Sequence, residues 1–111
     1  MKNPKYELCK GSNKKTYFRL KAGNGQIVLQ SQGYKTPAGA KAGITSVKKN
    51  ARNINNFVMK QSKNGKHYFN LVAGNKGIVG SSQMYTQPRG CKSGMVAVKK
   101  CASSPTENLT K

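Results

Sequence analysis

Residues 17–51 read YFRLKAGNGQIVLQSQGYKTPAGAKAGITSVKKNA, and residues 68–102 read YFNLVAGNKGIVGSSQMYTQPRGCKSGMVAVKKCA. At this constant offset of 51 residues, nineteen of the thirty-five aligned positions are identical and no gap is needed. The chain is therefore one unit written twice. Two units are too few for a solenoid, which needs three or more repeats to bury its stacked faces, so the sequence predicts an internal pseudo-dimer with one shared core.

The length of 111 residues suits one compact domain, and each half alone is close to the size at which a core becomes marginal. We expect a single domain over residues 1–111, built of a first repeat at about 4–52 and a second at about 55–103. Residues 104–111 form a polar tail that frays or adds a short edge strand. The expected state is a monomer with internal pseudo-twofold symmetry.

A β-hairpin is predicted around Asn24-Gly25, which separates two segments of alternating polarity. Such a pair favours a type I′ turn, because both central residues need positive φ. Counting outward pairs Leu20 with Leu29 and Lys21 with Val28. The second copy repeats the pattern around residues 74–77. The side chains expected on the inner face are Phe18, Leu20, Ala22, Ile27 and Leu29 in the first copy, and Phe69, Leu71, Ala73 and Ile78 in the second. Those expected to face outward include Val28 and Val79.

A third strand precedes each hairpin, because Tyr6 and Leu8 alternate with polar residues, as do Phe57 and Met59. A helix follows each hairpin. In the first copy Thr36 is a favourable N-cap and Pro37 suits the first helical position, whereas Gln87 is a weaker cap in the second. The apolar stripes at helical spacing are Ala40, Ile44, Val47 and Ala51, and Cys91, Met95, Val98 and Ala102.

Each helix also contains two glycines four residues apart, which are Gly39 and Gly43 in the first copy and Gly90 and Gly94 in the second. A glycine lowers helix propensity by about 1 kcal/mol relative to alanine. Close packing of helix on sheet would compensate that loss. The pattern therefore predicts a tight contact at these positions.

Several of these segments resemble the YegP-like family of small bacterial tandem-repeat proteins, over nearly the whole chain. They are LKAGNG at 20–25, GITSVKKNA at 43–51, and YFNL at 68–71 together with GSSQMY at 80–85. The resemblance implies an α+β fold of two β-β-β-α-β repeats. Their strands form one mainly antiparallel sheet, two helices pack on one face, and the C-terminal strands are exchanged between repeats. The residues alone indicate the β-β-β-α order twice. The family has no assigned activity, so the resemblance implies no function.

The most unusual property of the chain is its charge, with 21 Lys and Arg residues against two carboxylates and a net charge of +19. Only three of the 21 are Arg, so eighteen are Lys. Lysine contacts phosphate as a point charge, whereas the planar guanidinium group of arginine, with its paired donors, is better suited to recognising bases. The resemblance to the YegP-like family implies acidic residues at the positions where this chain has Gln26 and Gln32, and in the helix near Lys41 and Ala42. On that resemblance, we expect the high basicity to be a property of this chain and not of the family.

Two surfaces are candidates for binding nucleic acid or another polyanion. On the helices, one cationic row is repeated at equivalent positions, comprising Lys41, Lys48 and Lys49 with Lys92, Lys99 and Lys100. On the outer sheet face, tyrosines beside cations resemble a stacking platform for single strands, comprising Tyr17, Tyr68, Arg19 and Lys21. Lysines at a helix C-terminus also complement the macrodipole and are normal in a solvated helix end. The leading hypothesis is weak, sequence-non-specific polyanion binding. The alternative is a structural or accessory protein whose charge is incidental or engineered.

Catalytic residues are scarce, and we expect no enzyme, no metal site and no cofactor. The two carboxylates, Glu7 and Glu107, lie at opposite ends of the chain, so a carboxylate dyad is not expected. The one imidazole is His67, and an enzyme would need it beside a thiol such as the outward-facing Cys9. The three cysteines are an odd number without metal-site spacing.

The chain has no apolar stretch longer than four residues, far short of the roughly 18 to 20 that a membrane span needs. Its first residues, MKNPK, are followed by no apolar run or small-residue cleavage site. We therefore expect no membrane association and a cytoplasmic location.

Overall fold

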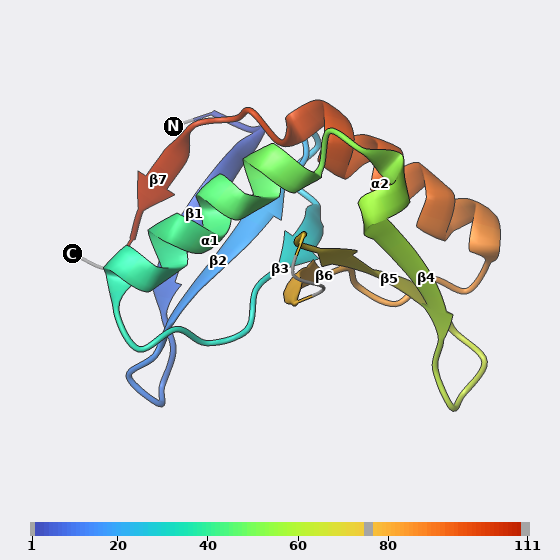
Figure 1. The fold of residues 1–111 in the computed structure, drawn as a ribbon, viewed down its shortest axis with the longest axis horizontal. Coiled ribbons are helices and arrows are strands. Elements are labelled where there is room, and N and C mark those ends of the chain that lie inside the picture. Colours follow the sequence, from blue (N-terminus) through green and yellow to red (C-terminus); the bar gives the residue numbers. More distant parts are fainter. Residues whose placement is uncertain (1, 75–76, 110–111) are drawn as a thin grey trace.

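The computed structural model describes residues 2–74 and 77–109 and shows the order β-β-β-α twice (Figure 1). The first repeat contains β1 (Lys5–Lys10), β2 (Thr16–Lys21) and β3 (Ile27–Gln30), followed by the helix α1 (Pro37–Asn50). A short 3-10 helix, η1 (Ile54–Asn56), connects the repeats.

The second repeat has the same layout and one additional strand. It contains β4 (Phe57–Gln61), β5 (His67–Val72), β6 (Ile78–Ser81), the helix α2 (Pro88–Cys101) and β7 (Thr106–Asn108). β7 lies within the segment that the sequence suggested as a polar tail.

The strands form one sheet in the order β4-β5-β6-β3-β2-β1-β7. β3 and β6 join the two repeats at its centre, where Gln30 lies opposite Ser81 in an antiparallel pair. These two residues occupy equivalent positions, so the pseudo-twofold axis passes through this junction. All pairs of named strands are antiparallel except β1 with β7. The α+β class and the mainly antiparallel sheet are confirmed.

Strand exchange between the repeats runs in one direction. β7, from the second repeat, pairs with β1 of the first, as expected. At the end of the first repeat, residues 54–56 form η1 and lead directly into β4. The connection from α1 to β4 is therefore too short to include a separate edge strand equivalent to β7. β4 therefore ends the described sheet on the opposite side from β7, as Figure 1 shows.

The turn between β2 and β3 is not the predicted type I′ turn. Gly25 has a φ of 84°, whereas Asn24 is not in the left-handed region. The Gly25 N–H donates to Ala22 O, and the Ala22 N–H donates to Gln26 O, both at 2.9 Å. This is a three-residue loop in which a left-handed glycine follows a type I turn. The matching turn of the second repeat includes residues 75–76, which lie outside the described residues.

This longer loop changes which side chains face inward. Leu20 pairs with Leu29 as predicted, but a register shift after Leu20 places Lys21 opposite Ile27. The extra residue, Val28, is 5% exposed instead of facing outward. In the second repeat Val79 is likewise buried, and Ile78 is 51% exposed, so the predicted orientation of both was wrong. A β-bulge interrupts the two-residue alternation on which those predictions depended.

The helices follow the predicted pattern. Thr36 caps α1, its Oγ1 accepting a hydrogen bond from the Gly39 N–H at 3.1 Å, and Gln87 makes no such side-chain bond at α2. The apolar stripes of both helices and the inward side chains of the strands form one buried cluster. Both helices therefore cover the same face of the sheet.

The predicted close approach of helix to sheet involves tyrosines that follow β3 and β6. A Cβ added at Gly43 would lie 2.4 Å from Tyr34 Oη and 2.8 Å from Phe18 Cε2. The equivalent atom at Gly94 would lie 2.3 Å from Tyr85 Oη. Each tyrosine thus lies against the helix backbone at a point where only glycine leaves room.

Candidate polyanion-binding surface

The C-terminal ends of α1 and α2 converge near the top of the molecule in Figure 1. A depression of about 310 Å³ lies there, lined by Lys48, Arg52, Lys99, Ala102 and Ser103. We call it the axial depression. Lys48 and Lys99 are equivalent residues of the two repeats, as are Arg52 and Ser103. The depression therefore contains three cationic side chains, contributed by both repeats around the pseudo-twofold axis.

Buried contacts beneath the axial depression hold its floor in place. The Tyr6 hydroxyl donates to Ala102 O at 2.7 Å, and Tyr6 is fully buried. Burial raises the pKa of this hydroxyl well above its ordinary value, so it remains a neutral donor. The Lys48 Nζ lies 5.6 Å from the centre of the Tyr6 ring, within the range of a cation–π contact. One buried tyrosine thus joins β1, the end of α2 and a lysine of α1.

The other predicted helix lysines extend this positive surface without lining the axial depression. Lys49 and Lys100 are exposed in the last turns of the helices, and Lys41 is exposed near the start of α1. Lys92 lines a separate shallow depression with Arg89 on α2. The structure therefore brings together Lys48 and Lys99 but not all six lysines.

Arg52 is the functional candidate that the sequence argument missed. In the sequence it begins the polar segment RNINN (52–56) between the two repeats. The available signal was its spacing, because it follows Lys48 by four residues and would share its side of a continuing helix. That signal is weak, since Ser103 replaces it in the second repeat.

The outer sheet face is less positive than the sequence suggested, because a buried carboxylate lies among its cations. Arg19 Nε donates to Glu7 Oε1 at 2.6 Å, and Lys21 Nζ lies 3.3 Å from the same oxygen. Lys5 Nζ lies 3.4 Å from the other oxygen. Among the residues that the structure describes, the ion pairs that join Glu7 and Glu107 to cations involve these three and none of the helix lysines.

Tyr17 and Tyr68 do not form a shared stacking platform. Tyr17 is on β2 and Tyr68 is on β5, with β6 and β3 between them. Three strand spacings correspond to roughly 14 Å, which is too far for the two rings to contact one base. The Tyr17 hydroxyl accepts a hydrogen bond from Asn13 Nδ2 at 2.9 Å.

The two carboxylates are neighbours in space, although they lie at opposite ends of the chain. Glu7 lies opposite Glu107 in the pairing of β1 with β7, and Lys5 Nζ also lies 2.5 Å from Glu107 Oε1. Burial raises the pKa of Glu7, but hydrogen bonds from Arg19 and Lys21 outweigh it and the pKa falls below its usual value. The hydrogen bond from Lys5 lowers the pKa of Glu107. Both groups are bound as ions, whereas a general acid at neutral pH needs a raised pKa.

A thiol–imidazole pair of Cys9 and His67 is not formed. Cys9 is on β1 and His67 is on β5, and β6, β3 and β2 separate them, which corresponds to roughly 19 Å. Burial raises the pKa of both Cys91 and Cys101, which makes these thiols less reactive. Within the described part of the chain, no three metal-ligating side chains are grouped together. No described helix is long and apolar enough to cross a membrane.

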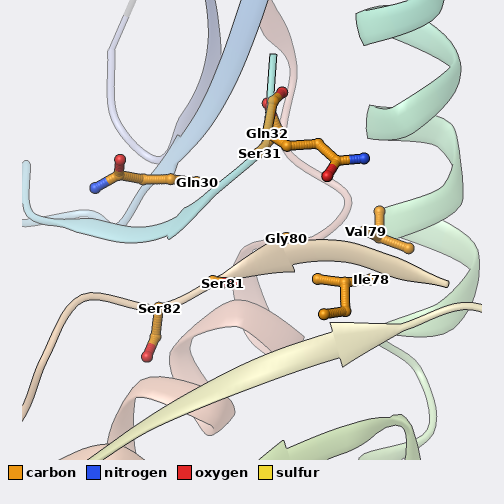
Figure 2. Close-up of a pocket in the computed structure, with 8 residues that line it drawn as sticks. All are labelled: Gln30, Ser31, Gln32, Ile78, Val79, Gly80, Ser81 and Ser82. Atoms are coloured by element: carbon orange, nitrogen blue, oxygen red, sulfur yellow. The ribbon is translucent and has the colours of Figure 1, made fainter. Parts of the chain in front are cut away.

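A second depression on the pseudo-twofold axis has a different character. It has a volume of about 390 Å³ and lies where β3 meets β6 (Figure 2). It is lined by Gln30, Ser31, Gln32, Ile78, Val79, Gly80, Ser81 and Ser82, none of which is charged. The hydroxyls of Ser31 and Ser82 accept hydrogen bonds from the backbone of β2 and β5. Its polar groups therefore maintain the sheet, and it lacks the cations that an anion site requires.

The chain is similar to a known protein family and to several known proteins. A family model described as "Domain of unknown function (DUF1508)" matches residues 12–56 and 62–107. The chain is 43% identical over 101 residues to the UPF0339 protein YegP of Shigella flexneri, covering 91% of this chain and 92% of that protein. It is 40% identical over 107 residues to a UPF0339 protein of Photorhabdus laumondii, covering 96% and 94%.

Two solved structures are also similar. The solution NMR structure of the protein of unknown function YegP from E. coli superposes with a TM-score of 0.92 at 37% identity, covering 99% of this chain and 96% of that one. The solution NMR structure of a UPF0339 protein from Shewanella oneidensis has a TM-score of 0.89 at 39% identity, covering 96% and 91%. None of these names states an activity.

Proposed function

This chain belongs to the DUF1508 family, whose function is unknown, and we propose that it binds nucleic acid or another polyanion weakly and without sequence specificity. The binding surface is the axial depression and the adjacent helix lysines, Lys49 and Lys100. The proposed role is non-enzymatic, requires no cofactor and is performed by a monomer.

The observation that carries the proposal is the convergence of Lys48, Arg52 and Lys99 on one depression. Three cations around a concave surface can contact neighbouring phosphates of one strand, and each contact releases condensed counterions. Neither Glu7 nor Glu107 pairs with any of them in the described structure. The outer sheet face is the weaker candidate, because its Arg19 and Lys21 are already bound to Glu7.

The absence of sequence specificity follows from the residue types. Two of the three cations are lysines, which bind phosphate without reading base edges. The depression contains no exposed aromatic side chain on which a base would stack. Affinity should therefore depend on charge density and salt more than on sequence.

The test is fluorescence anisotropy with labelled single-stranded and double-stranded oligonucleotides across a salt series. The variant K48Q/R52Q/K99Q removes the three cations of the axial depression. The matched control K15Q/K63Q/K66Q removes three exposed cations from the turns that project at the bottom of Figure 1. Both variants lower the net charge equally.

If the three cations contact phosphates of a duplex, the slope of log K against log salt should fall by about 2 to 3 in the first variant. The control should change it much less. If the two variants changed the salt slope equally, the axial depression would not be the binding site. The oligonucleotide would then be attracted by the overall positive charge of the protein. Binding that is lost already below about 150 mM salt would favour the alternative, an accessory protein with incidental charge.

A further inference from the structure

The outer edge of β4 is open among the described residues, whereas the equivalent edge of β1 is covered by β7. β1 and β4 are equivalent strands, because Tyr6 and Leu8 align with Phe57 and Met59. β7 runs parallel to β1, and Tyr6 N–H donates to Pro105 O at 2.8 Å. The molecule thus contains one covered and one uncovered copy of the same sheet edge.

The backbone of Met59 points toward this open edge. Met59 lies opposite Phe69, whose N–H donates to Ser82 Oγ at 3.0 Å and whose C=O accepts from Ser82 N–H at 2.9 Å. Phe69 therefore uses both groups on the β6 side. Because directions alternate along an antiparallel ladder, the Met59 N–H and C=O point away from β5. The equivalent C=O, that of Leu8, accepts from Leu109 N–H at 2.8 Å.

The connection between the repeats occupies only the start of this edge. The Phe57 N–H donates to Ile54 O of η1. The equivalent group in the first repeat is the Tyr6 N–H, which donates to Pro105 O. Beyond that point the edge is regular, since all five residues of β4 pair with β5 without a bulge. Val58 beside it is 38% exposed and Ile54 is 44% exposed. Both a backbone ladder and apolar side chains are therefore available to a partner.

The side chains of this edge define the chemistry of its partner. Val58 stands where the covered edge has Glu7, so it favours an apolar residue opposite it. Lys60 follows on the same face of the strand, and Lys63 and Lys66 lie exposed in the next turn. A second copy of this chain is a poor partner, because its own +19 charge and edge lysine would be repelled.

We propose that the β4 edge binds an extended, acidic segment of a partner protein as an added strand parallel to β4. The segment places an apolar side chain opposite Val58 and a carboxylate opposite Lys60, two residues later. The Met59 N–H and C=O supply hydrogen bonds of the kind that β7 makes with β1, which is β-strand addition to an exposed edge. This interaction uses none of the cations of the axial depression and is independent of polyanion binding there.

The experiment is a titration of ¹⁵N-labelled protein with the blocked peptide Thr-Thr-Val-Asn-Glu-Thr, which is an acidic variant of the β7 pattern. The control peptide has Lys in place of Glu. Met59→Pro removes the outward N–H at an edge position, where proline is tolerated. Circular dichroism and thermal unfolding check that this variant folds. Lys60→Glu reverses the charge opposite the peptide carboxylate.

The acidic peptide should shift the amide signals of Met59 and its β4 neighbours saturably, and the control peptide should bind about two- to fivefold more weakly. Lys60→Glu should reverse this preference. Folded Met59→Pro should lose peptide binding while keeping the oligonucleotide affinity of the unaltered protein. No saturable shift at β4 with millimolar peptide would overturn the proposal, as would shifts centred on the axial depression. Shifts at β4 that depend on protein concentration without peptide would show that a second copy covers the edge instead.

Discussion

Glu7 lies directly opposite Glu107 in the parallel pairing of β1 with β7, and Lys5 Nζ contacts both carboxylates, at 3.4 Å and 2.5 Å. These are the two carboxylate side chains of a chain with 21 basic residues. Both are used to attach the C-terminal strand to the first repeat. The acidic groups therefore stabilise the edge of the sheet, and their ion pairs in the described structure involve no helix lysine.

Glu7→Gln should lower the free energy of unfolding by about 1 to 3 kcal/mol at neutral pH, because it removes the charge that Arg19, Lys21 and Lys5 share. The native pKa of Glu7 is lowered, so its contribution is present above the ordinary value of 4.5 and is lost as pH falls through the native value. Urea unfolding from neutral to acidic pH should show this decline, and it should be weaker in Glu7→Gln. Glu107→Gln, which changes a more exposed group, should have a smaller effect. An unchanged acid profile in Glu7→Gln would contradict this role.

Tyr6→Phe should destabilise the protein by about 1 to 3 kcal/mol, because it leaves the buried Ala102 carbonyl without its donor at 2.7 Å. The aromatic ring, and with it the contact to Lys48, is kept. Tyr17→Phe is the matched control, since its hydroxyl only accepts a hydrogen bond from Asn13 at the surface. Chemical denaturation measures both. Equal effects of the two substitutions on stability would show that the hydrogen bond to Ala102 O contributes no more than the surface bond of Tyr17.

Lys14→Gly should raise stability by about 0.5 to 1 kcal/mol. Lys14 has a φ of 66°, in the left-handed region that costs a non-glycine residue about 1 kcal/mol. The equivalent residue of the second repeat is already Gly65, with a φ of 81°. The reciprocal change Gly65→Ala should therefore destabilise by a similar amount. Thermal unfolding of both variants tests the pair, and a loss of stability in Lys14→Gly would refute the assignment of strain.

Gly43→Ala should destabilise the protein although alanine is the better helix former. The added Cβ would lie 2.4 Å from Tyr34 Oη and 2.8 Å from Phe18 Cε2. Overpacking of this kind costs about 1 to 3 kcal/mol, against about 1 kcal/mol gained in helix propensity. Tyr34→Phe removes the nearest atom, so Gly43→Ala should cost less in that background. Equilibrium unfolding of the double-mutant cycle would show whether this coupling exists.

The repeat in the sequence was sufficient to predict the order of elements, the two helices and most of the inner face. It succeeded because alternation and helical spacing are local properties of strands and helices. It failed at Val28 and Ile78, because a bulge after the hairpin turn reversed the alternation. The cap at Thr36 was also predictable, since the bond joins residues three apart in the chain.

The candidate site was predictable only in part. The paired lysines suggested a cationic helix surface, but a list of helix residues does not show where two helices end. Lys48 and Lys99 line one depression because the pseudo-twofold axis brings the helix C-termini together, and Arg52 joins them from the connection. The outer-face cations Arg19 and Lys21 are less available than the sequence indicates, because the pairing of β1 with β2 brings one oxygen of Glu7 within 2.6 Å of Arg19 Nε and 3.3 Å of Lys21 Nζ.

The sequence by itself determined that this protein is a duplicated β-β-β-α unit with one shared core and a large positive charge. These properties depend on local spacing and on composition, which chain connectivity does not alter. Only the tertiary structure decided that Glu7 meets Glu107, that the helix ends form the axial depression, and that β7 covers β1 while β4 stays open. Each depends on contacts between residues far apart in the chain. Strand order around the pseudo-twofold axis, and the short connection at residues 52–56, set those contacts.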